Sequence, residues 1–90
     1  MAKVQIPGIV ASKLSIPSEI SLSSPNVNVM LEDMFKTYPE SRDLICGEDG
    51  KLRRFVNIFV DGDDIRFLDG MDTEINDSSE VTMISAVAGG

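Results

Sequence analysis

One stretch of the chain has the spacing of an amphipathic helix, and no other feature constrains the fold as strongly. Its apolar side chains recur at i, i+3, i+4, i+7, i+8 and i+11, which is one face of a helix with 3.6 residues per turn. They are Val27, Met30, Leu31, Met34, Phe35 and Tyr38. We expect Ser24 to cap this helix, Pro25 to stand in its first turn and Pro39 to end it. Glu32 and Lys36 are expected to form an ion pair on its solvent side.

Segments with strand-like patterns lie on both sides of this helix. Their apolar residues alternate or form short runs bounded by turn residues, and they cover residues 3–10, 19–23, 52–60, 65–68 and 80–87. The first strand is expected to be irregular at Pro7. Residues 12–18 and 39–51 are predicted to be loops, and residues 71–79 to hold no more than a short helical turn.

The order of these elements predicts an α+β fold. A β-hairpin, one long helix, a second hairpin and a final strand fit a mixed sheet with one main helix packed on one face, which is the β-grasp. A ferredoxin-like fold would need a second long helix, and residues 73–78 are too few for one. We expect one domain over residues 1–85, followed by a flexible C-terminal tail over residues 86–90.

The strand predicted at residues 52–60 presents two apolar faces. Val56, Ile58 and Val60 alternate with Phe55, Asn57 and Phe59. A single helix covers one face of a small sheet, so Phe55 and Phe59 are candidates for an exposed partner-binding surface. The alternative is that the loops at residues 12–18 or 39–51 fold over the two aromatic rings.

The composition excludes several classes of function. The net charge is −7, from 15 acidic and 8 basic side chains, which argues against nucleic acids and anionic membrane surfaces as partners. No apolar run approaches the roughly 20 residues that span a bilayer. The single cysteine, Cys46, allows no internal disulfide, and we expect a cytoplasmic protein. The absence of histidine removes Ser-His-Asp, Cys-His and zinc-histidine sites, so we expect no enzyme.

Two local clusters are interpreted as structural. An EF-hand loop starting at Asp61 would need glycine at its sixth position and glutamate at its twelfth, where the chain has Arg66 and Asp72. We therefore predict no metal site and interpret these acids as turn residues. Cys46 has no histidine partner and is predicted to be an unreactive thiol. Arg53 and Arg54 point to opposite faces of a strand and form no shared anion clamp.

The end of the chain, SAVAGG, is small and uncharged, and it directly follows a predicted core strand. Five residues from Ala86 onward reach about 17 Å when extended. Glycine permits close approaches that a β-carbon forbids. Such a filament could deliver the Gly90 carboxylate into another enzyme's active site, where it could be activated as an acyl-adenylate.

The whole chain resembles the ubiquitin-like sulfur carriers. The resemblance is densest in LRRFVNIFVDGDDIRFLDG (residues 52–70) and EVTMISAVAGG (residues 80–90). That family includes the small subunit of molybdopterin synthase, the thiamine-pathway carrier and a carrier used in bacterial cysteine biosynthesis, and the chain is most similar to the last. It departs from the family pattern at Ser78-Ser79, where a Gly-Asp turn is common, and at Ser85, where proline is common.

The resemblance implies a protein-borne sulfur donor with no bound cofactor. Gly90 would be adenylated by an E1-like enzyme with ATP and magnesium, and a sulfur donor would convert it to a thiocarboxylate. In the cysteine route the thiocarboxylate would react on a pyridoxal-phosphate-dependent cysteine synthase, and a zinc metallopeptidase would release the product. Val87, Ala88 and Gly89 would thread the partner's active site, and Phe55 and Phe59 would face the partner.

Three hypotheses stay open at the level of the sequence. The first is the sulfur carrier, with molybdopterin or thiazole synthesis as alternative destinations of the sulfur. The second is a ubiquitin-like modifier that forms isopeptide bonds to lysines. The third is an interaction module whose tail has no role.

Overall fold

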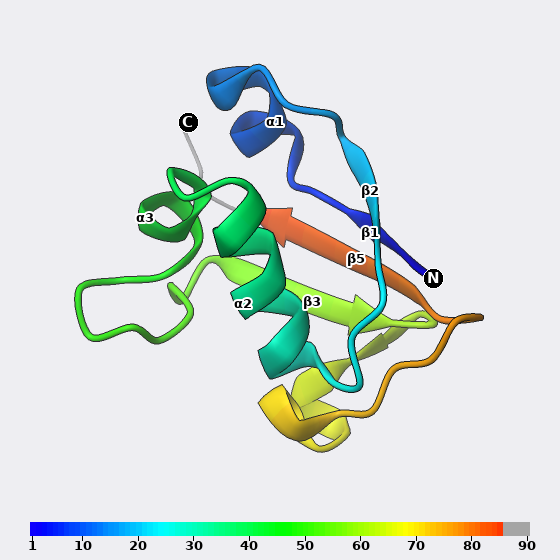
Figure 1. The fold of residues 1–90 in the computed structure, drawn as a ribbon. Coiled ribbons are helices and arrows are strands. Elements are labelled where there is room, and N and C mark those ends of the chain that lie inside the picture. The colour runs from blue at the N-terminus through cyan, green and yellow to red at the C-terminus, as the bar shows by residue number, and fades with distance from the viewer. Residues whose placement is uncertain (86–90) are drawn as a thin grey trace.

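The computed structural model describes residues 1–85 and shows a five-stranded mixed sheet with the strand order β2-β1-β5-β3-β4 (Figure 1). The strands are β1 (Ala2–Gln5), β2 (Glu19–Leu22), β3 (Val56–Val60), β4 (Asp63–Asp64) and β5 (Glu80–Ser85). The helices are α1 (Gly8–Leu14), α2 (Val27–Thr37), α3 (Ser41–Ile45) and the 3₁₀ turns η1 (Ile65–Phe67) and η2 (Gly70–Asp72). Strand β5 runs parallel to β1 and antiparallel to β3. The predicted tail, residues 86–90, lies outside the described residues.

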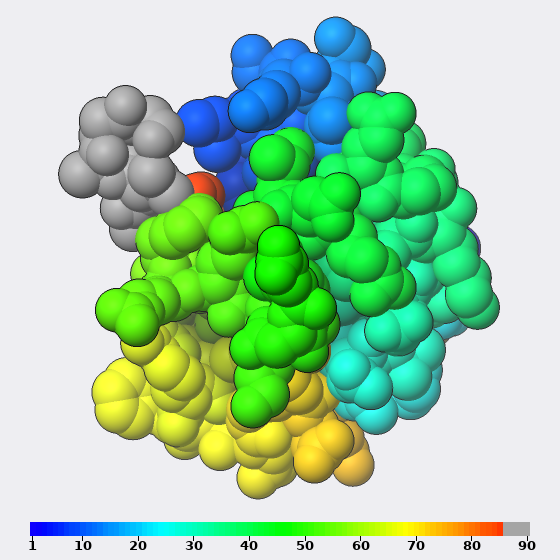
Figure 2. Space-filling view, turned by 90° about the vertical axis from the view of Figure 1, so that its left-hand side faces the viewer, coloured from blue at the N-terminus to red at the C-terminus, as the bar shows by residue number. Residues whose placement is uncertain are grey.

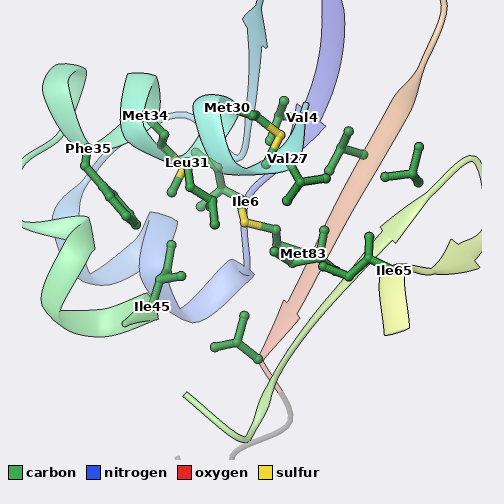
Figure 3. Packing of buried hydrophobic residues seen from close by; sticks show 14 of the residues in the cluster. Val4, Ile6, Val27, Met30, Leu31, Met34, Phe35, Ile45, Ile65 and Met83 are labelled. Carbon is green, nitrogen blue, oxygen red and sulfur yellow. The ribbon is translucent and has the colours of Figure 1, made fainter. Parts of the chain in front are cut away.

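The core lies between α2 and one face of the sheet, as the helix pattern predicted (Figure 3). Of the predicted stripe, only Tyr38 is half-buried, while the other five side chains are buried. The strands contribute alternate residues to this layer, among them Val4, Ile58 and Met83. Burial of each large apolar side chain contributes about 1.5–3 kcal/mol, so this layer is the main source of stability.

The start of α2 differs from the prediction, because Asn26 and not Ser24 is its N-cap. The Oδ1 atom of Asn26 accepts a hydrogen bond from the Val29 amide at 2.9 Å. Ser24 instead donates to Asp33 Oδ2 at 2.6 Å. The amide of Val27 donates to the carbonyl of Thr73 at 3.1 Å. Asn26 is as good a cap as Ser24 by local preference, and the bond to Thr73 in the loop before β5 favours the start at Val27.

The expected Glu32–Lys36 ion pair is absent from the salt bridges of residues 1–85. Glu32 Oε2 lies 3.9 Å from Arg42 Nη2 at the start of α3. The guanidinium of Arg42 also stacks over the Phe35 ring, 4.8 Å from its centroid. Both contacts of Arg42 are therefore with α2, and the helix α3 that carries Arg42 was not predicted.

The first predicted strand is too long, because it ends at Gln5 and α1 follows. The carbonyl of Pro7 accepts hydrogen bonds from Val10 and Ala11, each at 3.0 Å, and opens the helix. Helical turning buries Val10 and Ala11. Ser15 ends α1 in the left-handed region, at φ 55°. The predicted loop at residues 12–18 is therefore partly helical.

The second half of the chain contains three further differences. The predicted loop at residues 39–51 holds α3, and the strand predicted from residue 52 begins only at Val56. The predicted return strand at residues 65–68 is largely the 3₁₀ turn η1, since Asp64 Oδ1 accepts from the Arg66 amide at 2.8 Å and turns the chain. The short helical turn predicted within residues 71–79 is η2, and the final strand is confirmed as far as Ser85.

Candidate functional site at the end of strand β5

Strand β5 holds the last described residue, Ser85, in a defined place. It lies between β1 and β3, and Val4 pairs with Val81 while Val56 pairs with Ser85. A strand bonded on both sides cannot shift its register without moving its apolar side chains to the other face. The predicted site residues Val87, Ala88, Gly89 and Gly90 lie outside the described part of the chain. The structure therefore describes the surface around Ser85, the residue that directly precedes the predicted tail.

A groove lies beside Ser85, and we call it the collar groove. It has a volume of about 230 Å³. Helix α1, helix α3, the segment before β3 and the end of β5 supply its walls: Ile9, Val10, Lys13, Asp43, Leu44, Arg53, Phe55 and Ser85. Figure 2 looks toward this side, and the orange-red end of β5 is visible between the blue of α1 and the green of the middle segment.

Arg53 ties the middle segment to α3 at the rim of this groove. Its Nε and Nη2 atoms donate to the carbonyl oxygen of Asp43, at 3.0 and 2.7 Å. Its amide donates to the carbonyl of Ile45 at 3.0 Å. The last carbonyls of a helix have no partner within it, so Arg53 satisfies groups that α3 leaves open. Arg54 is exposed, and both arginines precede β3, so the prediction that they are adjacent strand residues on opposite faces is wrong.

The two aromatic residues predicted to share a partner-binding face are in different places. Phe55 precedes β3 and lines the collar groove, where α1 and α3 partly cover it. Phe59 is half-buried on the sheet face away from α2, in a hollow that Phe67 and Leu68 also line. Four strand residues advance about 13 Å, which explains why the two rings belong to separate surfaces. Phe67 and Leu68, both exposed, lie beside Phe59 and do not line the groove that holds Phe55.

The net charge is confined to one segment. Residues 61–80 carry eight acidic side chains and one basic, Arg66, while the other seven acidic and seven basic side chains of the chain cancel. In Figure 1 this segment, yellow to orange, lies at the start of β5. The collar groove includes Ser85, at the opposite end of that strand. The groove itself holds Lys13, Arg53 and Asp43. An acidic protein thus presents a locally cationic rim beside Ser85.

Asp61 and Asp64 have structural roles in the turns, as predicted. Asp61 Oδ1 accepts from the Glu80 amide at 2.9 Å. Asp64 receives hydrogen bonds from the Arg66 side chain and amide, which lower the pKa of its carboxyl. Within residues 1–85, no cluster of three or more histidine, cysteine or acidic side chains is placed to hold a metal ion.

The same described region contains no helix long and apolar enough to cross a membrane.

Cys46 follows α3 and is buried, and burial raises the pKa of its thiol. A raised pKa leaves little thiolate at neutral pH, which agrees with the predicted unreactive thiol.

Ile9, Lys13 and Leu44 were missed as site residues because α1 and α3 were not predicted. A signal was present for α1: Val10, Ala11 and Leu14 recur at i, i+1 and i+4, and Pro7 directly precedes the first turn. The short α3 offers no comparable period.

A mixed sheet whose last strand lies parallel to its first, covered by one principal helix, defines a β-grasp protein of the ubiquitin-like class. The chain belongs to the ThiS family, whose model matches residues 4–90. The resemblance to ubiquitin-like sulfur carriers is therefore confirmed.

The relatives cover nearly the whole chain. It is 36% identical over 89 residues to the sulfur carrier protein CysO of Mycobacterium tuberculosis, which covers 97% of this chain and 96% of that protein. The CysO chain in the Amycolatopsis orientalis BexX/CysO complex superposes with a TM-score of 0.86 at 28% identity, covering 100% of both chains. The small archaeal modifier protein 1 of Methanosarcina acetivorans gives a TM-score of 0.82 at 27% identity, covering 99% of this chain and 95% of that one.

Proposed function

We propose that this chain is a sulfur carrier that works through the carboxylate of Gly90. The observation that carries the proposal is the family match, which extends through residue 90. The register of β5 supports it, because a fixed Ser85 gives the five following residues a fixed starting point. Without histidine the chain has no ordinary general base near neutral pH, so the catalytic groups are expected to come from partner enzymes.

The proposed chemistry begins on an E1-like adenylating enzyme. A carboxylate oxygen of Gly90 attacks the α-phosphorus of magnesium-bound ATP, and pyrophosphate leaves. Hydrogen sulfide or an equivalent sulfide-level donor then attacks the acyl carbon and displaces AMP, which yields the thiocarboxylate. A persulfide donor would first give an acyl disulfide, and a thiol would have to reduce its S–S bond to release the thiocarboxylate. The chain itself binds no cofactor, and ATP and magnesium belong to the partner. An ATP-consuming reaction of this kind is expected in the cytoplasm.

We propose cysteine biosynthesis as the destination of the sulfur. The similarity to CysO supports this assignment. The thiocarboxylate sulfur would add to an aminoacrylate held by a pyridoxal-phosphate-dependent synthase, an acyl shift from sulfur to nitrogen would give an amide, and a zinc metallopeptidase would hydrolyse it. Molybdopterin and thiazole synthesis are the alternative destinations.

Co-expression with the adenylating enzyme and a sulfur source tests the proposal. We expect the intact protein to gain the mass that corresponds to replacement of one oxygen by sulfur, and a variant without Gly90 to show no gain. If the wild-type chain stays unmodified, or if the shortened variant is still modified, the proposal is wrong.

A protein modifier is the second candidate, favoured by the similarity to the small archaeal modifier protein 1. It would join Gly90 to lysine amines of other proteins. Trypsin cleaves last after Arg66, so a conjugate would carry residues 67–90 as a branch on the modified lysine. This branched peptide, present in cells with the wild-type chain and absent with the Gly90 deletion, would support this function.

A further inference from the structure

We propose that the collar groove is the surface on which the adenylating enzyme docks, and that it receives an apolar side chain flanked by a carboxylate beside the mouth of that enzyme's active-site channel. This inference rests on the proposed function and specifies where the partner binds. It selects between the two separate surfaces that hold Phe55 and Phe59.

The length of the chain after Ser85 limits where such an enzyme can sit. Five residues span no more than about 17 Å, and part of that length must enter a channel before Gly90 reaches a reacting atom. The mouth of the channel therefore lies close to Ser85. Ser85 is itself part of the collar groove and pairs with Val56 at the start of β3. The Phe59 hollow is lined by residues from the other end of β3 onward. A partner that takes the tail therefore lies next to the groove.

The shape of the groove suits a single large anchor. Its walls are mostly apolar, with Val10, Leu44 and Phe55 deeper and Ile9 at the rim, where 47% of the Ile9 side chain is exposed. The groove's volume of about 230 Å³ accommodates one large apolar side chain. Interfaces gain most of their energy from such anchors in desolvated pockets, with a polar rim around them.

The charges at the rim specify the neighbour of that anchor. Lys13 and Arg53 face one acid, Asp43, so the rim is cationic although the molecule has a net charge of −7. Arg53 donates two of its five side-chain N–H groups to the Asp43 carbonyl oxygen. The other three are able to donate to a carboxylate of the partner. Because these hydrogen bonds already hold its side chain in place, little entropy is lost when a partner binds.

Paired variants test the inference. Ile9→Ser/Lys13→Glu alters the collar groove, and Leu68→Ser/Lys36→Glu is the matched control. Leu68 is 42% exposed in the Phe59 hollow, and Lys36 stands in the last turn of α2 as Lys13 does in α1. The partner is the adenylating enzyme that modifies the wild-type chain in the co-expression test, and pyrophosphate release is measured against carrier concentration. We expect the collar variant to raise KM about tenfold with kcat unchanged, and the control to stay near the wild type.

The inference is overturned if the KM of the collar variant exceeds that of the control by less than threefold. Two results would have this form: neither variant changes KM, or the control raises KM because the Phe59 hollow is the docking surface. Either result contradicts the inference. The milder Ile9→Ala/Lys13→Ala variant, expected to raise KM about threefold, guards against a folding defect, and thermal unfolding confirms that each variant is folded. If the wild-type chain is not adenylated at all, the proposed function fails and this inference fails with it.

Discussion

Arg53 donates two hydrogen bonds to one main-chain oxygen, that of Asp43, from Nε at 3.0 Å and Nη2 at 2.7 Å. The bond pair joins the segment that leads into β3 to helix α3, ten residues earlier in the chain. It therefore shapes one wall of the collar groove.

Replacing Arg53 by alanine is expected to lower the free energy of unfolding by about 1–2 kcal/mol, because hydrogen bonds from a charged donor are lost and a helix-end carbonyl loses its partner. Arg54→Ala is the matched control, since Arg54 is adjacent and exposed, and it should stay within about 0.5 kcal/mol of the wild type. Urea denaturation followed by circular dichroism measures both. Equal effects of the two changes would show that the bond pair contributes nothing.

The cap of α2 gives a second prediction. Asn26→Ala should cost about 1 kcal/mol, because the Val29 amide loses its acceptor. Asn26→Ser should retain most of the stability, since serine is an equally good cap. The same denaturation experiment applies, and a serine variant as unstable as the alanine variant would contradict the capping role.

Acid should remove the contribution of the Asp64–Arg66 pair. Hydrogen bonds from Arg66 lower the pKa of the Asp64 carboxyl in the folded state. A lowered pKa means that the pair stabilises the fold above the ordinary aspartate pKa of about 3.9, and that this contribution is lost as the pH falls through the folded-state value. Asp64→Asn should therefore destabilise the protein at pH 7 and make much less difference at pH 2.

Thermal unfolding of the wild type, Asp64→Asn and Asp63→Asn across this pH range provides the measurement. Asp63 is the exposed neighbour in β4 and should behave as the wild type. A destabilisation by Asp64→Asn that is as large at pH 2 as at pH 7 would exclude an ionic contribution.

The proposed route of the tail predicts that Gly89→Ala reduces thiocarboxylate formation about tenfold or more, because a β-carbon next to the reacting residue displaces Gly90 within a narrow channel. Ala88→Gly removes a β-carbon one residue earlier and should retain activity. Mass spectrometry after co-expression quantifies the product, and thermal unfolding should give the same midpoint for all three chains. Full modification of the Gly89→Ala variant would refute a close-fitting channel.

The sequence predicted the class of fold because its strongest patterns belong to the elements that build the core. The stripe from Val27 to Phe35 and the alternation of Val56, Ile58 and Val60 follow from which side chains must leave water, and all of them are buried. Periodicity of this kind survives in the tertiary structure, since burying those side chains is what stabilises it.

The site was predicted less completely. Phe55 and Phe59 were assigned to one surface because alternation alone decides which face a residue occupies, and it says nothing about what lies above each end of a strand. The helices α1 and α3 line the groove that holds Phe55 and contribute nothing to the hollow of Phe59. Helix α3 has only the five residues Ser41–Ile45. So short a helix has too little periodicity to be recognised, and its stability comes from contacts such as those of Arg53 and Arg42.

The amino-acid sequence by itself determined the single long helix, the order of strands around it, the confinement of the net charge to residues 61–80 and the small uncharged end after the last strand. These are properties of composition and period, which each segment carries alone. Only the tertiary structure decided that Asn26 begins α2, that Lys13 and Arg53 line one groove with Ser85, and that Phe55 and Phe59 lie apart. Those outcomes depend on contacts between segments distant in the chain, whose free energies outweigh local preferences.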